Sequence, residues 1–493
     1  MLEKKLNNIE SGWNFDNSYR KLPNILYTKI KPIPVKNSNL VYFNKDLAEK
    51  LGLNFTNLSK KYLSDMFSGN ILPENSEPIA QAYAGHQFGH FTMLGDGRGI
   101  LLGEHISPNN KKVDVALKGS GKTPYSRNGD GRASLGPMLR EYIISEAMYG
   151  LKIPTTRSLA VTTTGEIINR ETPLEGSILT RIASSHIRVG TFQYLSMKGD
   201  IETLKKLVKY SLERHYPEET IIRNPAITLL ESVISKQISL VINWMRVGFI
   251  HGVLNTDNVT ISGETIDYGP CAFMNIYNPL TVFSSIDHQG RYSFNNQSII
   301  THWNISRFAE TLIPLIDSDE KKAIKIGEEI INQFQNNFKI QWVNMMKDKL
   351  GFFNHENEDE IFIQKLLEWM YKNKADYTNT FLYLINNKLI QGDMYNLDSF
   401  KEIKNQWEKR ILKNNLSLDL SKRKMNSNNP FVIPRNHMVE KSLNNILENK
   451  DYKLFKNILK ICKNPYIKSK NNNVLNNLPD PIDENKYKTF CGT

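Results

Sequence analysis

The sequence predicts an α+β protein with a β-rich amino-terminal lobe, a helical carboxy-terminal lobe and a helical extension beyond it. Residues 76–190 contain short β-prone runs such as GILLGE and SLAVTTTG between Gly-rich turns, which is typical of strands. From about residue 200 the apolar residues recur at helical spacing instead. With 493 residues the chain is long enough for two or three domains, or for one large two-lobed protein with a sizeable core.

This change of pattern divides the chain into four parts. One helix interrupts the strands of the β-rich lobe over residues 137–149, because Pro137 suits a first helical turn and Leu139, Tyr142 and Ile143 belong to an apolar stripe. We expect residues 1–75 to form a segment that packs on the small lobe and residues 76–195 to form that β-rich lobe. Residues 196–350 are expected to form the helical lobe, and residues 351–493 an extension with a tail.

The helical lobe is expected to begin with a long, largely buried helix around residues 229–245. Asp317 and Glu320 have the pattern of a capping box that opens a helix of roughly thirty residues. The end of the chain is polar and loop-like. Shorter amphipathic helices are predicted at 359–373, 376–388, 397–414, 437–449 and 453–462.

The composition excludes several classes of protein. Hydrophobic residues make up 40% and charged residues 23%, as in soluble globular proteins, and no apolar run is long enough to span a membrane. The beginning MLEKKLNNIESGWNFD lacks the apolar stretch of a secretory signal and carries early acids. Three cysteines without a cysteine–histidine cluster indicate a reducing compartment and no zinc site. We therefore expect a bacterial cytoplasmic protein that does not bind membranes.

The net charge of +12 does not by itself indicate a nucleic-acid partner. The excess is mostly Lys scattered among Asn and Ile, and no element carries a basic patch with interleaved aromatic residues. We expect no specific nucleic-acid binding, and part of the charge has a local use in the nucleotide site described next.

The segment HGVLNTDNVTISGETIDYG, residues 251–269, predicts a nucleotide–metal site. Asn258 and Asp267 lie where a protein kinase places the Asn and Asp that hold Mg²⁺ against ATP. The position of the Asp that orients the attacking hydroxyl in kinases is Val253, which cannot bind a proton. Asp257, beside Asn258, is close enough to a metal ligand to act as a base. The metal site is therefore predicted to be intact, whereas ordinary γ-phosphoryl transfer is compromised.

Lys118 closes the apolar run 113–117, where the small lobe of a kinase carries the Lys that reaches the phosphates. Glu141, one turn into the following helix and off its apolar stripe, is the expected partner of Lys118. Together with the metal motif, this pair predicts a protein-kinase-like two-lobed fold.

Two Gly–Arg segments, 95–98 and 129–132, flank the Lys118 strand. Glycine lets backbone N–H groups close on an anion, and Arg offers a planar fork to phosphate oxygens. Arg181 and Arg188 add two cations beyond the last strand of the small lobe.

Two familiar motifs are incomplete here. LKGSGKT lacks a P-loop glycine at Ala116, and Pro124 prevents the helix that would receive phosphates. HQFGH has the spacing of a zinc-binding helix, but Gln87 replaces the Glu that would be the general base.

At this point the chain resembles the selenoprotein O (YdiU) family of protein adenylyltransferases. The resemblance is carried by AYAGHQFGHFTMLGDGRGILLGE, DVALKGSGKTPYSRNGDGRASLGPMLREYIISEAM, HGVLNTDNVTISGETIDYGP and the terminal FCGT. It is dense from about Phe15 to Tyr292, resumes at NPFVIPRNHMVEKSL, and so covers nearly the whole chain.

The resemblance implies a pseudokinase that binds ATP turned end for end and transfers AMP to Ser, Thr or Tyr hydroxyls of other proteins. Lys118 would then contact phosphate, Glu141 would fix Lys118, and Asp257 would accept the proton. Asn258 and Asp267 would hold Mg²⁺ or Mn²⁺. The ATP-binding residues implied are Gly95, Gly97, Arg98, Lys118, Asp130, Gly131, Arg181, Arg188 and Asp267.

In the family a terminal Cys or selenocysteine can pair with a Cys of the activation-loop region. Cys491 matches the terminal position, but the loop FSSIDH at residues 283–288 carries no Cys, and Cys271 is the one candidate nearby. A redox-active thiol and an idle exposed one are both consistent with Cys491.

Two other functions are consistent with parts of the pattern. A small-molecule or protein-kinase-like phosphotransferase would share the HG start of the catalytic loop, although its loop needs Asp at position 253. A scaffold that binds nucleotide without turnover would share the metal motif.

Overall fold

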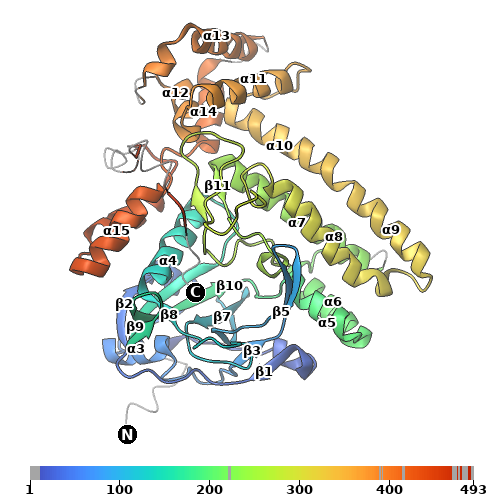
Figure 1. The fold of residues 1–493 in the computed structure, drawn as a ribbon, viewed down its shortest axis with the longest axis vertical. Helices are drawn as coiled ribbons and strands as arrows, with labels where there is room; N and C mark the ends of the chain where they lie inside the picture. The colour runs from blue at the N-terminus through green and yellow to red at the C-terminus, as the bar shows by residue number, and fades with distance from the viewer. Residues whose placement is uncertain are drawn as a thin grey trace.

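The computed structural model describes residues 11–219, 224–387, 390, 392–413, 417–468, 475, 478–479 and 487–489. One large sheet lies at the foot of the molecule in Figure 1, and long helices extend away from it. The chain therefore combines an antiparallel sheet with many helices, which agrees with the α+β class predicted from the sequence.

The main sheet has the strand order β1-β3-β6-β7-β10-β9-β2, and β8 pairs with β10. All its pairings are antiparallel. Arg181 on β10 lies opposite Ala116 on β7, so Arg181 and Lys118 share one face of the sheet. The strands are β1 (Tyr27–Lys29), β2 (Asn39–Phe43), β3 (Ile79–Gln81), β6 (Gly99–Ile106), β7 (Lys112–Lys118), β8 (Ala133–Ser134), β9 (Arg157–Asn169) and β10 (Pro173–Ala183).

Each face of the sheet is covered by a different set of helices. Helices α2 (Lys45–Lys50) and α3 (Lys60–Ser68) pack on the face that carries Val115 and Leu117, and form a separate small core. The opposite face, with Leu179, packs against α4 (Leu135–Gly150) and joins the large core of the helical part. Lys118 and Arg181 therefore face the helical part of the protein.

Two small hairpins complete the β-structure. Strands β4 (Ala84–Gln87) and β5 (His90–Met93) form one, and β11 (Phe249–Ile250) pairs with β12 (Ala272–Phe273) in the other. The second pair brackets residues 251–271, so the predicted metal segment begins and ends at one place.

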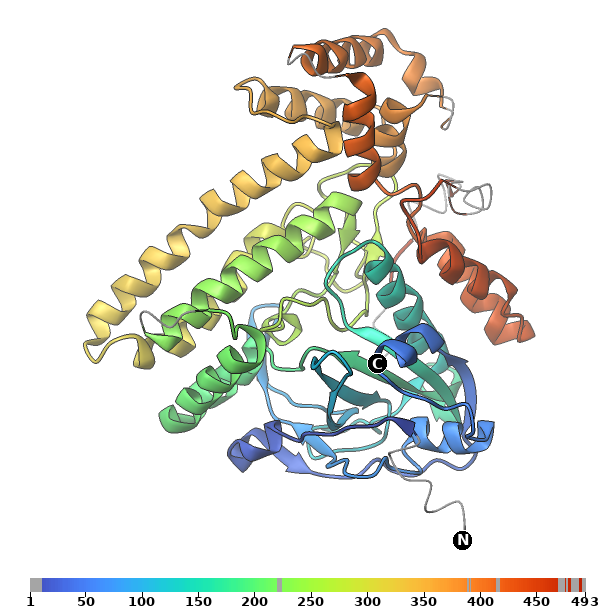
Figure 2. The same ribbon diagram turned by 180° about the vertical axis from the view of Figure 1, so that it is seen from behind.

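Helix α7 (Pro225–Val247) is the centre of the helical part. Asn224 caps its first turn, and Gly248 ends it in the left-handed conformation that glycine tolerates best. It packs against α6, α8 and α10, as the view from behind in Figure 2 shows. Alone among the described helices, α7 is long and apolar enough to cross a membrane, but 61% of its apolar window is buried, as in a core helix.

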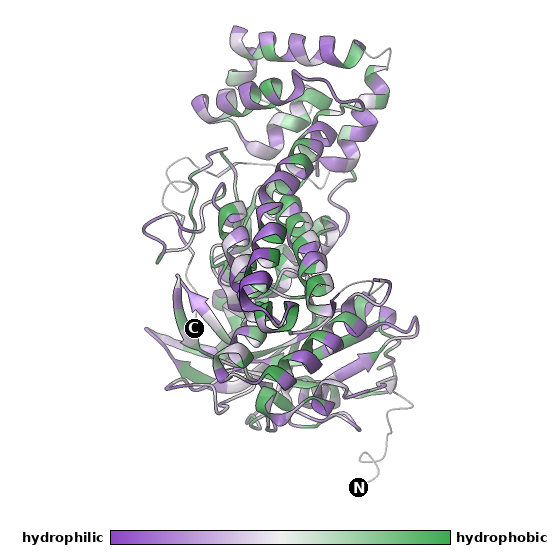
Figure 3. Cartoon of the chain, turned by 90° about the vertical axis from the view of Figure 1, so that its right-hand side faces the viewer, coloured by the Kyte–Doolittle hydropathy of each residue, from purple (hydrophilic) through white to green (hydrophobic). Residues whose placement is uncertain are grey.

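The helices of the carboxy-terminal half are amphipathic, with hydrophobic and hydrophilic residues alternating along them in Figure 3. Helices α15 and α16 return to pack on α4. The helices not yet given are α5 (Val189–Lys198), α6 (Ile201–His215), α8 (Gln297–Ile316), α9 (Glu320–Asn332), α10 (Phe334–Leu350), α11 (Asp359–Lys372), α12 (Tyr377–Ile385), α13 (Asp398–Leu412), α14 (Leu418–Asn428), α15 (Asn436–Asn449) and α16 (Lys453–Cys462), with short 3₁₀ turns η2 (Tyr19–Lys21), η3 (Asn24–Leu26), η4 (Thr256–Asn258) and η5 (Asp393–Asn396).

The predicted helix of roughly thirty residues after Asp317 is wrong, because the structure has two helices, α9 and α10, that meet at Gln333. The cap is also different: Asp319, not Asp317, accepts hydrogen bonds from the N–H groups of Lys321 and Lys322. Helix α14 was not predicted. The five shorter helices are present with ends within a few residues, although residues 388 and 414 lie outside the described part of the chain.

Candidate functional site

A cavity of about 400 Å³ lies between strands β6, β7 and β10 of the main sheet and the segment 253–270. Its wall is polar and rich in Arg and Gly. Every residue that the sequence assigned to nucleotide, metal or proton transfer contributes to this wall, with the exception of Glu141: Gly95, Gly97, Arg98, Lys118, Asp130, Gly131, Arg181, Arg188, Asp257, Asn258 and Asp267.

Glu141 lies behind the wall, on α4, and is almost fully buried. One of its oxygens accepts from Lys118 Nζ at 2.7 Å, which is the predicted contact. The other accepts from Arg181 Nε at 2.9 Å and Nη2 at 2.6 Å. Burial alone would raise the pKa of Glu141, but the charges of Arg181 and Lys118 outweigh it and lower that pKa. Glu141 is therefore ionised and holds both cations at the cavity.

Asp267 is surrounded by three cations. One carboxylate oxygen lies 3.3 Å from Lys118 Nζ and 2.7 Å from Arg181 Nη2, and the other lies 2.7 Å from Arg188 Nη1. Burial opposes the charge of Asp267, but these neighbours hold its pKa well below the usual range. Its backbone has φ 59°, a left-handed conformation that Asp tolerates better than most residues.

Asp257 differs from Asp267, because few neighbouring groups neutralise the negative charge of its carboxylate. The side chain is 7% exposed, and Oδ1 has no hydrogen-bond partner among the described residues. Arg188 donates to the backbone carbonyl of Asp257 at 2.7 Å, not to its carboxylate. Burial raises the pKa of Asp257 to about 6, which is suited to accepting a proton near neutral pH.

Two glycines fix the place of Asp257. A Cβ atom on Gly85 of β4 would lie 2.5 Å from Asp257 Oδ1, and one on Gly190 of α5 would lie 2.0 Å from the carbonyl oxygen of Ala84. The hairpin β4–β5 also contacts the segment directly, since the N–H of His86 donates to Thr256 Oγ1 at 2.7 Å. The carboxylate of Asp257 thus packs against Gly85, which has no side chain, and faces the cavity on its other side.

Gly85→Ala should therefore lower catalytic turnover by about 10–100-fold with little change in nucleotide affinity, because the methyl group displaces the carboxylate of Asp257. Steady-state kinetics and nucleotide titrations check this result. Gly327→Ala on α9 is the control, since its Cβ would meet Ile313 Cδ1 at 3.3 Å, a contact that a small side-chain shift relieves. Normal turnover in the Gly85 variant would contradict a base at Asp257.

Asn258 is oriented by its own loop. Its Nδ2 donates to the carbonyl of Val253 at 2.8 Å, which leaves Oδ1 as the atom available to a cation. No group of three or more His, Cys, Asp or Glu side chains within the described ranges could hold a metal ion. One amide oxygen and one carboxylate fit a hard divalent cation whose other ligands are phosphate oxygens and water. The carboxylate of Asp267 retains acceptor sites beyond those its three cations use.

The two Gly–Arg segments both pack against the loop 121–126, which also borders the cavity. A Cβ on Gly95 would lie 2.4 Å from the ring of Tyr125, and one on Gly131 would lie 2.1 Å from the carbonyl oxygen of Gly121. These glycines therefore have a packing role as well as lining the cavity. Asp130 accepts from both terminal nitrogens of Arg170, at 2.8 and 2.9 Å.

Several residues of the wall were not found from the sequence. Arg170 lies in a turn with no motif, and Arg127 lies two residues before the second Gly–Arg segment. Tyr83 lies under the guanidinium of Arg188, 4.7 Å from it, in a contact that depends on tertiary packing. The sequence offers no local signal for these positions. Further lining residues of this kind are Gln81, Asp96 and His186.

Of the two cysteines considered for a redox pair, the structure describes Cys271 but not Cys491. Cys271 is buried, its Sγ accepts from Arg140 Nη1 at 3.6 Å, and burial raises the pKa of its thiol. Cys491 lies outside the described residues. Close before it in the sequence, Thr489 pairs with Ser284, so residue 489 lies beside the loop 283–288.

Arg140 ties α4 to the end of the metal segment. Its guanidinium donates to the carbonyl of Gly269 at 2.8 Å and to that of Cys271 at 2.5 Å. The next residue, Glu141, holds Lys118 and Arg181, so one turn of α4 contacts both walls of the cavity.

The chain matches one protein family and several named relatives over nearly its whole length. The family described as "Protein adenylyltransferase SelO" matches residues 11–463. The chain is 54% identical to "Protein nucleotidyltransferase YdiU" of Pelagibacter ubique over 98% of its own length and 99% of that protein. Proteins of the same name from Nitrosococcus oceani and Bacillus thuringiensis subsp. konkukian are 52% and 53% identical, over 98% and 99% of this chain and 98% and 99% of theirs.

Proposed function

Because the chain belongs to the SelO family of protein adenylyltransferases, and is thus a nucleotidyltransferase, we propose that it transfers AMP from ATP to Ser, Thr or Tyr hydroxyls of other proteins. Pyrophosphate is the second product. The observation that carries the proposal is the pair of positions 253 and 257. Val253 lines the cavity where a kinase has its orienting Asp, and four residues later lies a buried carboxylate whose Oδ1 has no partner among the described residues.

The fold proposed for this reaction is that of a pseudokinase with two lobes. The ion pair between Lys118 on β7 and Glu141 on α4, with Asp267 3.3 Å from the same Lys, supports it. The proposed parts are an amino-terminal segment (1–75), a small lobe (76–195), a helical lobe (196–350) and an extension with its tail (351–493). The proposed location is the bacterial cytoplasm, with neither a membrane nor a specific nucleic acid as partner.

The nucleotide is proposed to bind turned end for end, with the α-phosphorus near Asp257 and the β- and γ-phosphates near Arg181 and Arg188. An acceptor hydroxyl attacks the α-phosphorus, its proton passes to Asp257, and the bond to the β-phosphate oxygen breaks. Negative charge then grows on pyrophosphate, which Lys118 and the two arginines are placed to neutralise. Asn258 and Asp267 would hold Mg²⁺ or Mn²⁺, which supplies further charge neutralisation when bound.

ATP labelled separately at the α and γ positions tests the proposal, with purified protein and a generic protein acceptor. The α label should appear on the acceptor and the γ label should leave in pyrophosphate. Transfer of the γ label alone would establish the phosphotransferase alternative instead. Val253→Asp refines the comparison, because it restores the carboxylate that kinases use, and it should not produce γ transfer if the nucleotide is reversed.

A further inference from the structure

His186 lines the cavity but has no part in the reaction described above. It follows β10 in the stretch Ser184-Ser185-His186, and its side chain is 5% exposed. Its Nε2 has no hydrogen-bond partner among the described residues. A buried polar atom left unpaired is destabilising, so the arrangement indicates a partner that the described residues do not supply.

The other side of the imidazole is held firmly. Its Nδ1 lies 2.9 Å from Asp114 Oδ2, and the backbone N–H of His186 donates to the same oxygen at 2.8 Å. Since a carboxylate is an acceptor, Nδ1 carries the hydrogen. Nε2, on the opposite side of the ring, is therefore turned away from Asp114.

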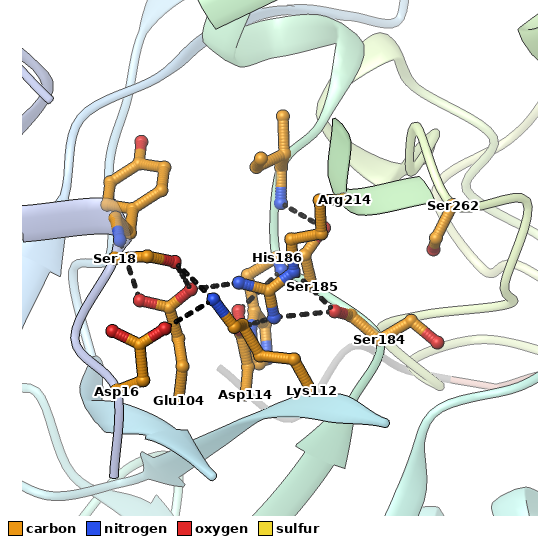
Figure 4. A network of polar contacts seen from close by, with 12 residues as sticks. Asp16, Ser18, Glu104, Lys112, Asp114, Ser184, Ser185, His186, Arg214 and Ser262 are labelled. Carbon is orange, nitrogen blue, oxygen red and sulfur yellow. Dashed lines mark hydrogen bonds and ion pairs between the residues drawn. The ribbon is translucent and has the colours of Figure 1, made fainter. Parts of the chain in front are cut away.

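Asp114 is itself anchored by a second layer, shown in Figure 4. Arg214 of α6 donates to Asp114 Oδ1 at 2.6 Å and pairs with Glu104, and all three side chains are buried. The guanidinium also donates to the carbonyl of Ser184 at 2.7 Å, in the stretch that carries His186. Two strands and one helix thus fix the position of His186 and hold its Nδ1 against Asp114.

The surroundings of His186 indicate which part of a nucleotide it meets. Arg188 follows two residues later, and Arg181 and Lys118 line the same cavity, so the cations gather in the region that His186 borders. Acidic side chains border this region too: Asp114 contacts the ring, and Asp96 lines the cavity with a pKa that burial raises and that the charges of Arg188 and His186 lower. A cationic region of this kind suits phosphate groups better than a purine ring.

We propose that His186 is a further nucleotide-contacting residue, whose Nε2–H donates a hydrogen bond to the β- or γ-phosphate, the part that leaves as pyrophosphate. Asp114 is the positioning residue for it. With phosphate on one side and Asp114 on the other, the imidazole would be held by a hydrogen bond at each of its two nitrogens. The assignment to the leaving group depends on the proposed function, whereas the phosphate contact does not.

Calorimetric titrations of the full chain with ATP, AMP and inorganic pyrophosphate in the presence of Mg²⁺ test this proposal. His186→Leu should weaken ATP and pyrophosphate binding about tenfold and leave AMP binding unchanged. His186→Gln, which keeps an N–H donor near Nε2, should restore most of the affinity. Asp114→Asn keeps the imidazole and should show a smaller loss in the same direction.

His302→Leu is the matched control, because His302 on α8 also has an unpartnered Nε2 but does not line the cavity. It should leave all three affinities unchanged. The proposal would be overturned if the His186 variants weakened ATP and AMP binding equally, or weakened neither. Melting temperatures identify any variant that fails to fold. These titrations need no turnover, so their outcome is independent of whether the α or the γ label is transferred.

Discussion

Asp257→Asn should lower the rate of AMP transfer by about 10²–10⁴-fold, the usual contribution of a general base, while ATP affinity stays close to that of the original protein. The change removes the proton acceptor but keeps the shape of a side chain that is packed against Gly85. Single-turnover rates and nucleotide titrations measure the two quantities separately. A variant with full activity would exclude Asp257 as the base, and one that no longer binds ATP would assign it a binding role instead.

The pH dependence gives an independent check on Asp257. Its pKa is raised from 3.8 to about 6, and the base works only when it is deprotonated. The rate should therefore rise with pH up to about 6 and level off above it, and the Asn variant should lack this inflection.

The same shift has a consequence for stability. A carboxyl whose pKa is higher in the folded state stabilises folding below its unfolded pKa, and that contribution is lost as pH rises through about 6. At pH 8 the Asn variant should therefore melt no lower than the original protein. This measurement separates loss of the base from loss of the fold.

Asp267→Ala should abolish transfer, with a loss of about 10³-fold or more, and should remove the effect of Mg²⁺ on ATP binding. The reason is that Asp267 is both a proposed metal ligand and the anion shared by Lys118, Arg181 and Arg188. Without it the three cations remain free to meet phosphate, so ATP affinity measured with a chelator present should be retained or increased.

Titrations of ATP with and without Mg²⁺ measure this effect directly. Asp398→Ala, an exposed residue at the start of α13, is the control and should change neither affinity nor turnover. If the Asp267 variant kept a normal response to Mg²⁺, the metal would have to be held elsewhere. A protein that shows no transfer before the substitution would be a nucleotide-binding scaffold, not an enzyme.

The sequence predicted those parts of the site that depend on local spacing. Asn258 and Asp267 lie in one segment between two short strands, and Lys118 closes a strand before a strong helix, so their roles could be inferred from neighbouring residues. The sequence could not predict that Lys118 and Arg181 share Glu141, because this contact depends on the register of β7 and β10. His186 was missed because a single histidine after a strand has no pattern.

The misplaced helices have equally local explanations. Helical periodicity continues across Gln333 without Pro or Gly, so only tertiary packing decides that α9 ends and α10 begins there. Helix α14 is mostly polar, with Met425 as its buried hydrophobic residue, so it offers almost no apolar stripe to detect.

The three cations around Asp267 also determine how the substrates can arrive. Lys118, Arg181 and Arg188 already neutralise this carboxylate. If Asp267 holds the metal as proposed, a bare divalent ion would have to enter against three positive charges, whereas a triphosphate would attract those charges and bring its own cation as a chelate. We therefore expect a compulsory order of binding, in which the metal–nucleotide complex is the first substrate and free metal does not bind before it.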